Sequence, residues 1–205
     1  MEYWNTAITQ KSWDVLQKIR KEINFVLIGE WAVYLWAKSN KSKGIDIVVD
    51  GKELGKLKLN YNLNKNDNLR KYEIKIDEID IDIYVPFYSR IPIIRDMGSY
   101  KSKIEGFNVA NPEALLVIKQ AAEIDRSSTE KGMKDRLDIM DLLLKCDMDF
   151  SEYKKILERE NLIHFKRNLI ETIAKFKDFS YSGLSPRQFK LKKEELIKNI
   201  IKAFT

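Results

Sequence analysis

Two neighbouring stretches decide the fold, Phe25-Val26-Leu27-Ile28-Gly29-Glu30-Trp31-Ala32-Val33-Tyr34-Leu35-Trp36 and Lys43-Gly44-Ile45-Asp46-Ile47-Val48-Val49. In the first, a short apolar run ends at a glycine and a longer apolar run follows, which predicts a buried strand that turns sharply into a helix. The second is β-branched and almost wholly apolar, as is typical of an inner strand packed on both faces. Its one carboxylate, Asp46, must therefore be paired, coordinated or placed at a strand end facing solvent.

The segments around these stretches predict further strands and one helix. Apolar residues recur at helical spacing in residues 9–23, which predicts an amphipathic helix that covers one face of a sheet. Residues 56–63 alternate between polar and apolar side chains, which predicts a strand with one wet face. Residues 72–76 and 79–85 alternate in the same way on either side of a two-residue turn, so we expect a hairpin there.

The second half of the chain has a different pattern. Residues 86–110 show no clear period, and we expect them to be irregular apart from a short strand near residues 107–109. Asn111-Pro112 is typical of a helix start, and helices are expected near residues 112–125, 130–145, 150–159, 161–177 and 186–203. The expected fold class is therefore α+β, with a small mixed β-sheet flanked by helices in residues 1–110 and a C-terminal helical lobe with a basic tail in residues 111–205.

Composition limits the chemistry that this chain can support. Cys146 is the only cysteine and His164 the only histidine, which excludes intrachain disulfides, zinc sites of cysteine and histidine, and mechanisms that need two histidines. Any metal site must therefore rest on carboxylates. No run approaches the roughly 18 apolar residues of a membrane span. Because Met1-Glu2-Tyr3-Trp4 also lacks the pattern of a secretory signal, we expect a cytoplasmic protein with no membrane partner.

The net charge of +6 is concentrated at the C-terminal end of the chain. Residues 161–205 contain ten lysines and arginines against four acidic residues, while the rest of the chain is balanced. A basic tail suits a phosphate-rich partner such as RNA. Lysine-rich composition is also an ordinary feature of soluble proteins, so both interpretations stay open.

The order of strand, glycine turn, helix, acidic inner strand, two further strands and helix bundle resembles the minimal nucleotidyltransferases of the polymerase-beta-like superfamily. It is most similar to their AbiEii-like toxin group and related prokaryotic proteins. The resemblance is carried by residues 26–35, 43–49, 79–85 and 113–144, and so covers about residues 25–145. It implies the nucleotidyltransferase fold, a nucleoside triphosphate as substrate and Mg²⁺ as cofactor.

The family's first motif is a Gly-Gly or Gly-Ser pair between strand and helix, where small residues let backbone amides approach the triphosphate. Gly29 matches this motif and Glu30 does not. The resemblance implies that Gly29 and Glu30 lie in the nucleotide-binding turn. A plain strand-helix turn is the alternative, because a glutamate in the first turn stabilises a helix through its dipole while its charge repels a triphosphate unless it points away.

The family's metal ligands are an Asp-x-Asp pair on an inner strand and a third carboxylate on a neighbouring strand. Here the pair reads Gly44-Ile45-Asp46, so the first carboxylate is missing. The resemblance implies Asp46 and Asp82 as catalytic Mg²⁺ ligands, with Asp80, on the same strand face as Asp82, as a further candidate. The wet face of a half-buried strand also explains Asp80 and Asp82. Glu30 is a candidate to replace the missing carboxylate.

The family's fourth motif is a lysine and an arginine on one helix, followed by Lys-Asp-x-x-Asp on the next. Lys119 and Arg126 are seven residues apart and therefore share a helix face. The resemblance implies that Lys119 is a catalytic residue that reaches the phosphates and that Arg126 also lies in the nucleotide site. It implies that Asp135, also a catalytic residue, and Asp138 support the same side. An ion-pair network of Arg126 with Asp135 or Asp138 is the structural alternative.

Three functions follow as hypotheses. The first is Mg²⁺-dependent transfer of a nucleotidyl group from a nucleoside triphosphate to a hydroxyl of RNA or protein, to which the resemblance adds transfer RNA as a target and an antitoxin protein as a partner. The second is a binding or regulatory module that keeps the fold but has lost transfer, which Glu30 and Gly44 favour. The third is a basic RNA-binding protein that needs no nucleotide pocket.

Overall fold

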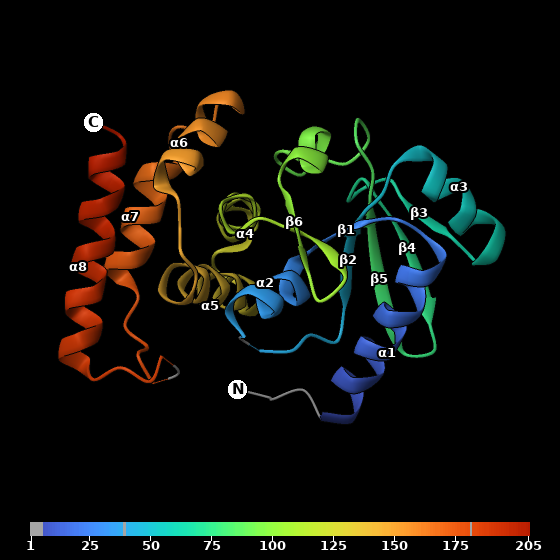
Figure 1. The fold of residues 1–205 in the computed structure, drawn as a ribbon, viewed down its shortest axis with the longest axis horizontal. Coiled ribbons are helices and arrows are strands. Elements are labelled where there is room, and N and C mark those ends of the chain that lie inside the picture. The colour runs from blue at the N-terminus through green and yellow to red at the C-terminus, as the bar shows by residue number, and fades with distance from the viewer. Residues whose placement is uncertain (1–5, 39, 181) are drawn as a thin grey trace. The chain divides into compact units, whose positions relative to one another are not determined.

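The computed structural model describes residues 6–38, 40–180 and 182–205. The chain forms two compact units, Met1–Asn111 and Pro112–Thr205 (Figure 1), whereas the sequence placed the boundary between residues 110 and 111. The first unit contains a mixed seven-stranded sheet and the second is helical in its described part, so the predicted α+β class is confirmed. No helix within the described ranges is long and apolar enough to cross a membrane. The N-terminal residues 1–4 lie outside these ranges.

The first unit alternates strands with short helices. Its main elements are α1 (Thr6–Glu22), β1 (Val26–Ile28), α2 (Gly29–Ala37), β2 (Ile45–Val48), α3 (Gly51–Asn60), β3 (Asn64–Asn66), β4 (Lys71–Ile76), β5 (Ile79–Tyr84), the 3₁₀ helix η1 (Ile94–Ser99), β6 (Lys101–Ile104) and β7 (Phe107–Ala110). The strand order across the sheet is β3-β4-β5-β2-β1-β7-β6. Because β2 lies between β5 and β1, the prediction of an inner strand is confirmed, as is the β4–β5 hairpin.

One face of the sheet is apolar. Paired residues of neighbouring strands point to the same side of a sheet, as do residues two apart on one strand. A fully buried row crosses four strands through Ile83, Ile47, Leu27 and Val109. Phe107 lies two residues before Val109, and its ring centroid is 5.5 Å from that of Trp13 in α1. Helix α1 therefore covers this apolar face, as predicted, and residues of the opposite parity lie on the other face.

The strand predicted for residues 56–63 is wrong, because most of this segment belongs to helix α3. Asp50 caps the helix by accepting a hydrogen bond from a backbone amide of the first turn at 2.8 Å. Leu54 and Leu57, three residues apart, are both buried. The alternation of lysine and leucine suggested a strand, but Leu59, which continues it, is 87% exposed.

Residues 86–110 are more regular than predicted. They contain η1 and the antiparallel pair β6–β7, and β7 confirms the short strand expected near residues 107–109. The strands β3 and β6 were not predicted. Both lie at edges of the sheet and both lack buried residues, so neither has the apolar run by which a strand is recognised in a sequence.

In its described residues, the second unit consists of helices. They are α4 (Pro112–Arg126), α5 (Glu130–Lys145), α6 (Phe150–Arg159), α7 (Phe165–Lys175) and α8 (Pro186–Ala203). All the predicted helices are present, although α7 is shorter than the predicted 161–177. Helix α4 packs against α5, α6 and α7, and Figure 1 shows α7 and α8 side by side.

A buried glutamine links three of these helices. Gln120 of α4 is fully buried, and its side-chain amide donates hydrogen bonds to the carbonyl oxygen of Phe165 and to Asn168 Oδ1, each at 3.0 Å. The Tyr153 hydroxyl of α6 donates to Gln120 Oε1 at 2.5 Å. Because both ends of the amide are satisfied, the orientation of α4 relative to α6 and α7 is specified by hydrogen bonds as well as by packing.

The helical assignment of α3 can be tested at Gly55. An added Cβ would meet no atom within 4 Å there, and alanine is favoured over glycine inside a helix by about 0.5–1 kcal/mol. We therefore expect Gly55→Ala to raise the free energy of unfolding by about that amount in urea titrations. Gly183→Ala is the control, because Gly183 also has open space but has φ +70°, so alanine should destabilise the protein. A loss of stability in Gly55→Ala would contradict the helix.

Candidate functional site

Gly29 joins β1 to α2 at a place where no other residue fits. Its φ of +70° is in the left-handed region, and a Cβ built there would lie 2.3 Å from Asp46 Oδ2. The close approach follows from the sheet register, because Ile28 pairs with Asp46. The cap residue of α2, Ile28, offers no side-chain hydrogen bond to the helix amides. The sequence thus places the Asp46 carboxylate directly beside the N-terminus of α2.

Glu30 lies in the first turn of α2 and is partly exposed. Its side chain makes no hydrogen bond or ion pair with the described residues. This position is favourable to the helix dipole, as the simpler interpretation of the sequence expected. A role for Glu30 as a replacement ligand or in nucleotide binding stays a prediction.

Asp46 and Asp82 are direct neighbours on the polar face of the sheet. Strands β2 and β5 are parallel, and their register pairs Asp46 with Asp82. The hydroxyl of Tyr84, two residues beyond Asp82, donates to Asp46 Oδ1 at 3.5 Å. At Gly44, where the family has its first carboxylate, the nearest atom to an added Cβ is the Asp80 carbonyl oxygen at 3.9 Å. A side chain would therefore fit at position 44, and steric crowding does not explain why this residue is a glycine.

Sequence reasoning missed a lysine in this group. Lys71 Nζ of β4 lies 2.6 Å from Asp82 Oδ2 and 3.0 Å from Glu73 Oε1. Asn66 of β3 donates to the same Glu73 oxygen at 3.0 Å. A signal was available, because a hairpin with a turn at residues 77–78 places position 73 opposite position 82 and position 71 opposite position 84.

The surroundings of Lys71 keep it charged. Burial alone would lower the pKa of Lys71, but its hydrogen bonds and attraction to Asp82 and Glu73 outweigh burial and raise the pKa above its ordinary value. The pKa of Glu73 is lowered in turn, chiefly by its hydrogen bond with Lys71. The polar face of the sheet therefore contains an ion-paired lysine beside the two candidate metal ligands.

Asp80, the other metal-ligand candidate, lies apart from this contact network. Its carboxylate is 3.8 Å from Lys75 Nζ, and both side chains are 63% exposed. Within the described ranges, no three or more acidic, cysteine or histidine side chains are grouped so that they could hold a metal ion. Mg²⁺ needs only one or two protein carboxylates when phosphates complete its shell. Asp46 thus fits one nucleotide-borne ion, but the residues present do not fit a two-ion site.

A cavity of about 210 Å³ lies farther along the same face. Its wall includes Val48, two residues from Asp46 on β2, and the Val26 side chain that pairs with it. Arg95 and Lys101 lie at its edge, and neither has an ion-pair partner in the described part of the chain. The cavity is therefore lined by apolar side chains together with two cations and the carboxylate of Asp50.

The candidate site residues on helices α4 and α5 lie close together in the second unit. Lys119 Nζ of α4 is 2.5 Å from Asp138 Oδ2 and 3.6 Å from Asp135 Oδ1, and all three residues are buried. Arg126 makes two parallel hydrogen bonds to Asp135, at 2.7 and 3.0 Å. This is the ion-pair network that the structural alternative anticipated. The roles in phosphate binding and catalysis that the resemblance gives Lys119, Arg126 and Asp135 stay predictions.

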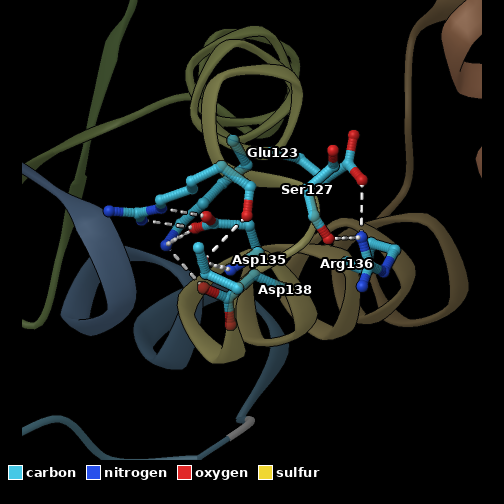
Figure 2. A network of polar contacts seen from close by, with 9 residues as sticks. Glu123, Ser127, Asp135, Arg136 and Asp138 are labelled. Atoms are coloured by element: carbon cyan, nitrogen blue, oxygen red, sulfur yellow. Dashed lines mark hydrogen bonds and ion pairs between the residues drawn. The ribbon is translucent and has the colours of Figure 1, made fainter.

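Two further contacts hold α4 against α5. Arg136 donates hydrogen bonds to Glu123 at 2.7 Å and to the Ser127 carbonyl oxygen at 2.9 Å. Figure 2 shows Arg136 on one side of the network and Asp135 and Asp138 on the other. A Cβ at Gly132 would lie 2.2 Å from the Arg126 carbonyl oxygen, so the start of α5 can approach the end of α4 only with glycine at this position. The two helices are thereby fixed in one register.

Gly29→Ala tests the close approach to Asp46. We expect a loss of at least about 2 kcal/mol in the free energy of unfolding, because the side chain requires an unfavourable φ and collides with the carboxylate. Gly51→Ala is the matched control, since Gly51 also begins a helix but has no atom within 4 Å of an added Cβ. Urea unfolding of both variants measures the difference, and equal stabilities would refute the contact.

Asp135→Asn tests the buried network. The change removes a buried charge that pairs with both Lys119 and Arg126, so we expect a loss of about 3 kcal/mol in the free energy of unfolding. Glu171→Gln on α7 is the control, because Glu171 also bridges two cations, Arg167 and Lys175, but does so at the exposed surface. The control should leave the melting temperature unchanged. Similar losses in both variants would contradict a special role for burial.

No family model and no curated protein matches this chain. Among solved structures, JHP933 from Helicobacter pylori is 17% identical, covers 95% of this chain and 94% of its own, and has a TM-score of 0.50. ANT(2″)-Ia in complex with adenylyl-2″-tobramycin is 13% identical, with 77% and 98% covered and a TM-score of 0.50. Megavirus polyadenylate synthase is 12% identical, with 94% of this chain and 49% of that chain covered and a TM-score of 0.51. The chain therefore has the nucleotidyltransferase fold that its sequence predicted.

Proposed function

We propose that the first unit binds a nucleoside triphosphate beside Gly29 and Asp46 and transfers its nucleotidyl group to a hydroxyl of an RNA or protein. The contact between Gly29 and Asp46 is the observation that carries this proposal. It brings a carboxylate against the start of α2, where the cap residue Ile28 offers the helix no side-chain hydrogen bond. A carboxylate that holds a cation and amides that bind phosphate are the two halves of a triphosphate site.

Each residue has a separate task in this proposal. The amides at the start of α2 bind phosphate oxygens, and the absence of a Cβ at Gly29 lets the phosphate chain approach the backbone. Asp46 holds the Mg²⁺ ion that accompanies the triphosphate, and the Tyr84 hydroxyl orients the Asp46 carboxylate. When bound, Mg²⁺ supplies neutralisation of the phosphate charge.

A binding or regulatory module that has lost transfer is the second candidate. Two observations favour it, the absence of a carboxylate at Gly44 and the ion pair between Asp82 and Lys71. Transfer requires activation of the acceptor hydroxyl, to which a second metal ion contributes in two-ion sites. A site with one available carboxylate retains nucleotide binding more readily than transfer.

The acceptor cannot be inferred from the fold, because function depends on the site and not on the scaffold. One structural neighbour is named for polyadenylate synthesis and another was determined with an adenylylated tobramycin. A finer proposal, that the chain is an AbiEii-like toxin acting on transfer RNA and neutralised by an antitoxin, rests on the sequence resemblance. The basic excess in residues 161–205 supports RNA as the partner.

Asp46→Asn tests the nucleotide site. Asparagine keeps the shape that packs against Gly29 but removes the charge that holds Mg²⁺, so we expect Mg²⁺-dependent binding of nucleoside triphosphates to weaken by at least about tenfold. Calorimetry with each of the four triphosphates, with and without Mg²⁺, measures this change. Asp77→Asn is the control, because it removes an exposed charge from the turn of the nearby β4–β5 hairpin, where asparagine tolerates the same positive φ.

An experiment with labelled triphosphates distinguishes the two candidate functions. Incubation with triphosphates labelled at the α-phosphate, in the presence of total RNA or protein, should label an acceptor in an Asp46-dependent way if transfer occurs. Nucleotide binding without a labelled acceptor would support the regulatory module. If no triphosphate binds at millimolar concentration, both proposals fail.

A further inference from the structure

Lys71 lies where the polar face of the sheet would otherwise be strongly negative. The β4–β5 register places Lys71 opposite Tyr84 and Glu73 opposite Asp82. Tyr84 in turn contacts Asp46, and Asp46 pairs with Asp82 across β2 and β5. Asp46, Glu73 and Asp82, which come from three strands, thus share one face, and Lys71 contacts two of these three carboxylates.

The lysine is held in this position. Its side chain is 12% exposed, and Nζ is 2.6 Å from one Asp82 oxygen and 3.0 Å from Glu73. Glu73 is itself held by the Asn66 amide. The same strands offer a comparison, because the Lys75–Asp80 pair is 3.8 Å long and 63% exposed on both sides. A long, solvated pair of that kind is loosely held, whereas the Lys71 ammonium is fixed by two charged partners.

We propose that the Lys71 ammonium takes the place of a second divalent cation at Asp82, so that this site binds a single divalent ion, through Asp46. A divalent ion at Asp82 would lie within a few ångströms of the ammonium, and this repulsion is strong where the surroundings are partly buried. The occupied carboxylate and the absent side chain at Gly44 therefore have the same effect. Each removes a ligand of the second ion.

This substitution has a chemical consequence for the site. An ammonium neutralises a carboxylate and donates hydrogen bonds, but it does not lower the pKa of a bound hydroxyl as a divalent metal ion does. The site would retain its affinity for the phosphates of a nucleotide and lose much of its capacity to activate an acceptor. The inference rests on the proposed nucleotide site for this functional meaning, but the number of metal sites can be measured without nucleotide.

The test measures Mn²⁺ binding to the full chain without nucleotide. Binding is detected as a loss of the free Mn²⁺ signal in electron paramagnetic resonance. We expect Lys71→Met to raise the Mn²⁺ affinity by about tenfold or more, because Asp82 becomes available to the ion. Lys71→Arg keeps the positive charge and should bind Mn²⁺ as the parent does. Lys75→Met is the matched control on the same strand and face, and should change the affinity by less than about threefold.

Asp82→Asn in the parent chain provides a readout that does not depend on the folding of Lys71→Met. Because Lys71 already occupies Asp82, this variant should leave Mn²⁺ affinity nearly unchanged, whereas Asp46→Asn should abolish it. The double variant Lys71→Met with Asp82→Asn should lose the increase in Mn²⁺ affinity that Lys71→Met shows alone. Circular dichroism confirms that each variant is folded.

Three results would overturn the proposal. They are an unchanged Mn²⁺ affinity in folded Lys71→Met, an equal gain in Lys75→Met, and a loss in Asp82→Asn as large as that in Asp46→Asn. The outcome is separate from the proposed function. If Lys71→Met gains Mn²⁺ affinity but no triphosphate binds, the nucleotide site fails and the role of Lys71 stands.

Discussion

The contact between the Gly29 backbone and the Asp46 carboxylate is the constraint on which the first unit depends. It requires glycine at the end of β1, since a Cβ would lie 2.3 Å from the carboxylate and φ is +70°. It requires β1 and β2 to be antiparallel neighbours with Ile28 opposite Asp46. It therefore also fixes where α2 begins. The positions of the carboxylate, the strand register and the helix N-terminus therefore depend on one another, and a change in any of them displaces the others.

The negative charge on the polar face that surrounds this contact is partly neutralised by a lysine of the same face. Asp46, Asp82 and Glu73 come from three strands, and Lys71 provides the compensating charge between two of them. Folding brings these carboxylates together, and a cation must compensate the cost of their proximity. In a nucleotidyltransferase with its complete set of carboxylates, metal ions supply that compensation. Here the Lys71 ammonium supplies part of that compensation through its ion pairs with Asp82 and Glu73.

The second unit uses buried charge for a different purpose. Lys119, Asp135 and Asp138 are almost inaccessible, and Arg126 closes the network at its outer edge. Pairs of this kind contribute little net stability but strongly disfavour any packing that separates them. Together with the close approach at Gly132, they specify one register of α4 on α5. The residues of the motif that resembles the family's helical pair thus also fix the packing of α4 on α5.

Local sequence determined the parts of this protein whose signals are local. The β1–α2 turn, the inner strand around Asp46, the β4–β5 hairpin and the helices of the second unit follow from apolar runs, glycine and proline, and capping residues. The resemblance also singled out Asp46, Asp82, Lys119 and Asp135 as catalytic residues. The structure shows that each forms contacts in one or the other unit, while the catalytic roles stay predictions. The sequence could not decide whether these contacts serve catalysis or structure.

The tertiary structure decided what depends on distant partners. Helix α3 looked like a strand because its leucines and lysines alternate from residue 56 onward, and only packing shows that Leu54 and Leu57, three residues apart, are buried while Leu59 is exposed. Edge strands β3 and β6 have no apolar run because they bury almost nothing. The pairing of Lys71 with Asp82 depends on the register of a hairpin. Sequence therefore determined the elements and their chemistry, and the tertiary structure determined which charges meet, because ion pairs are set by position in space rather than by spacing along the chain.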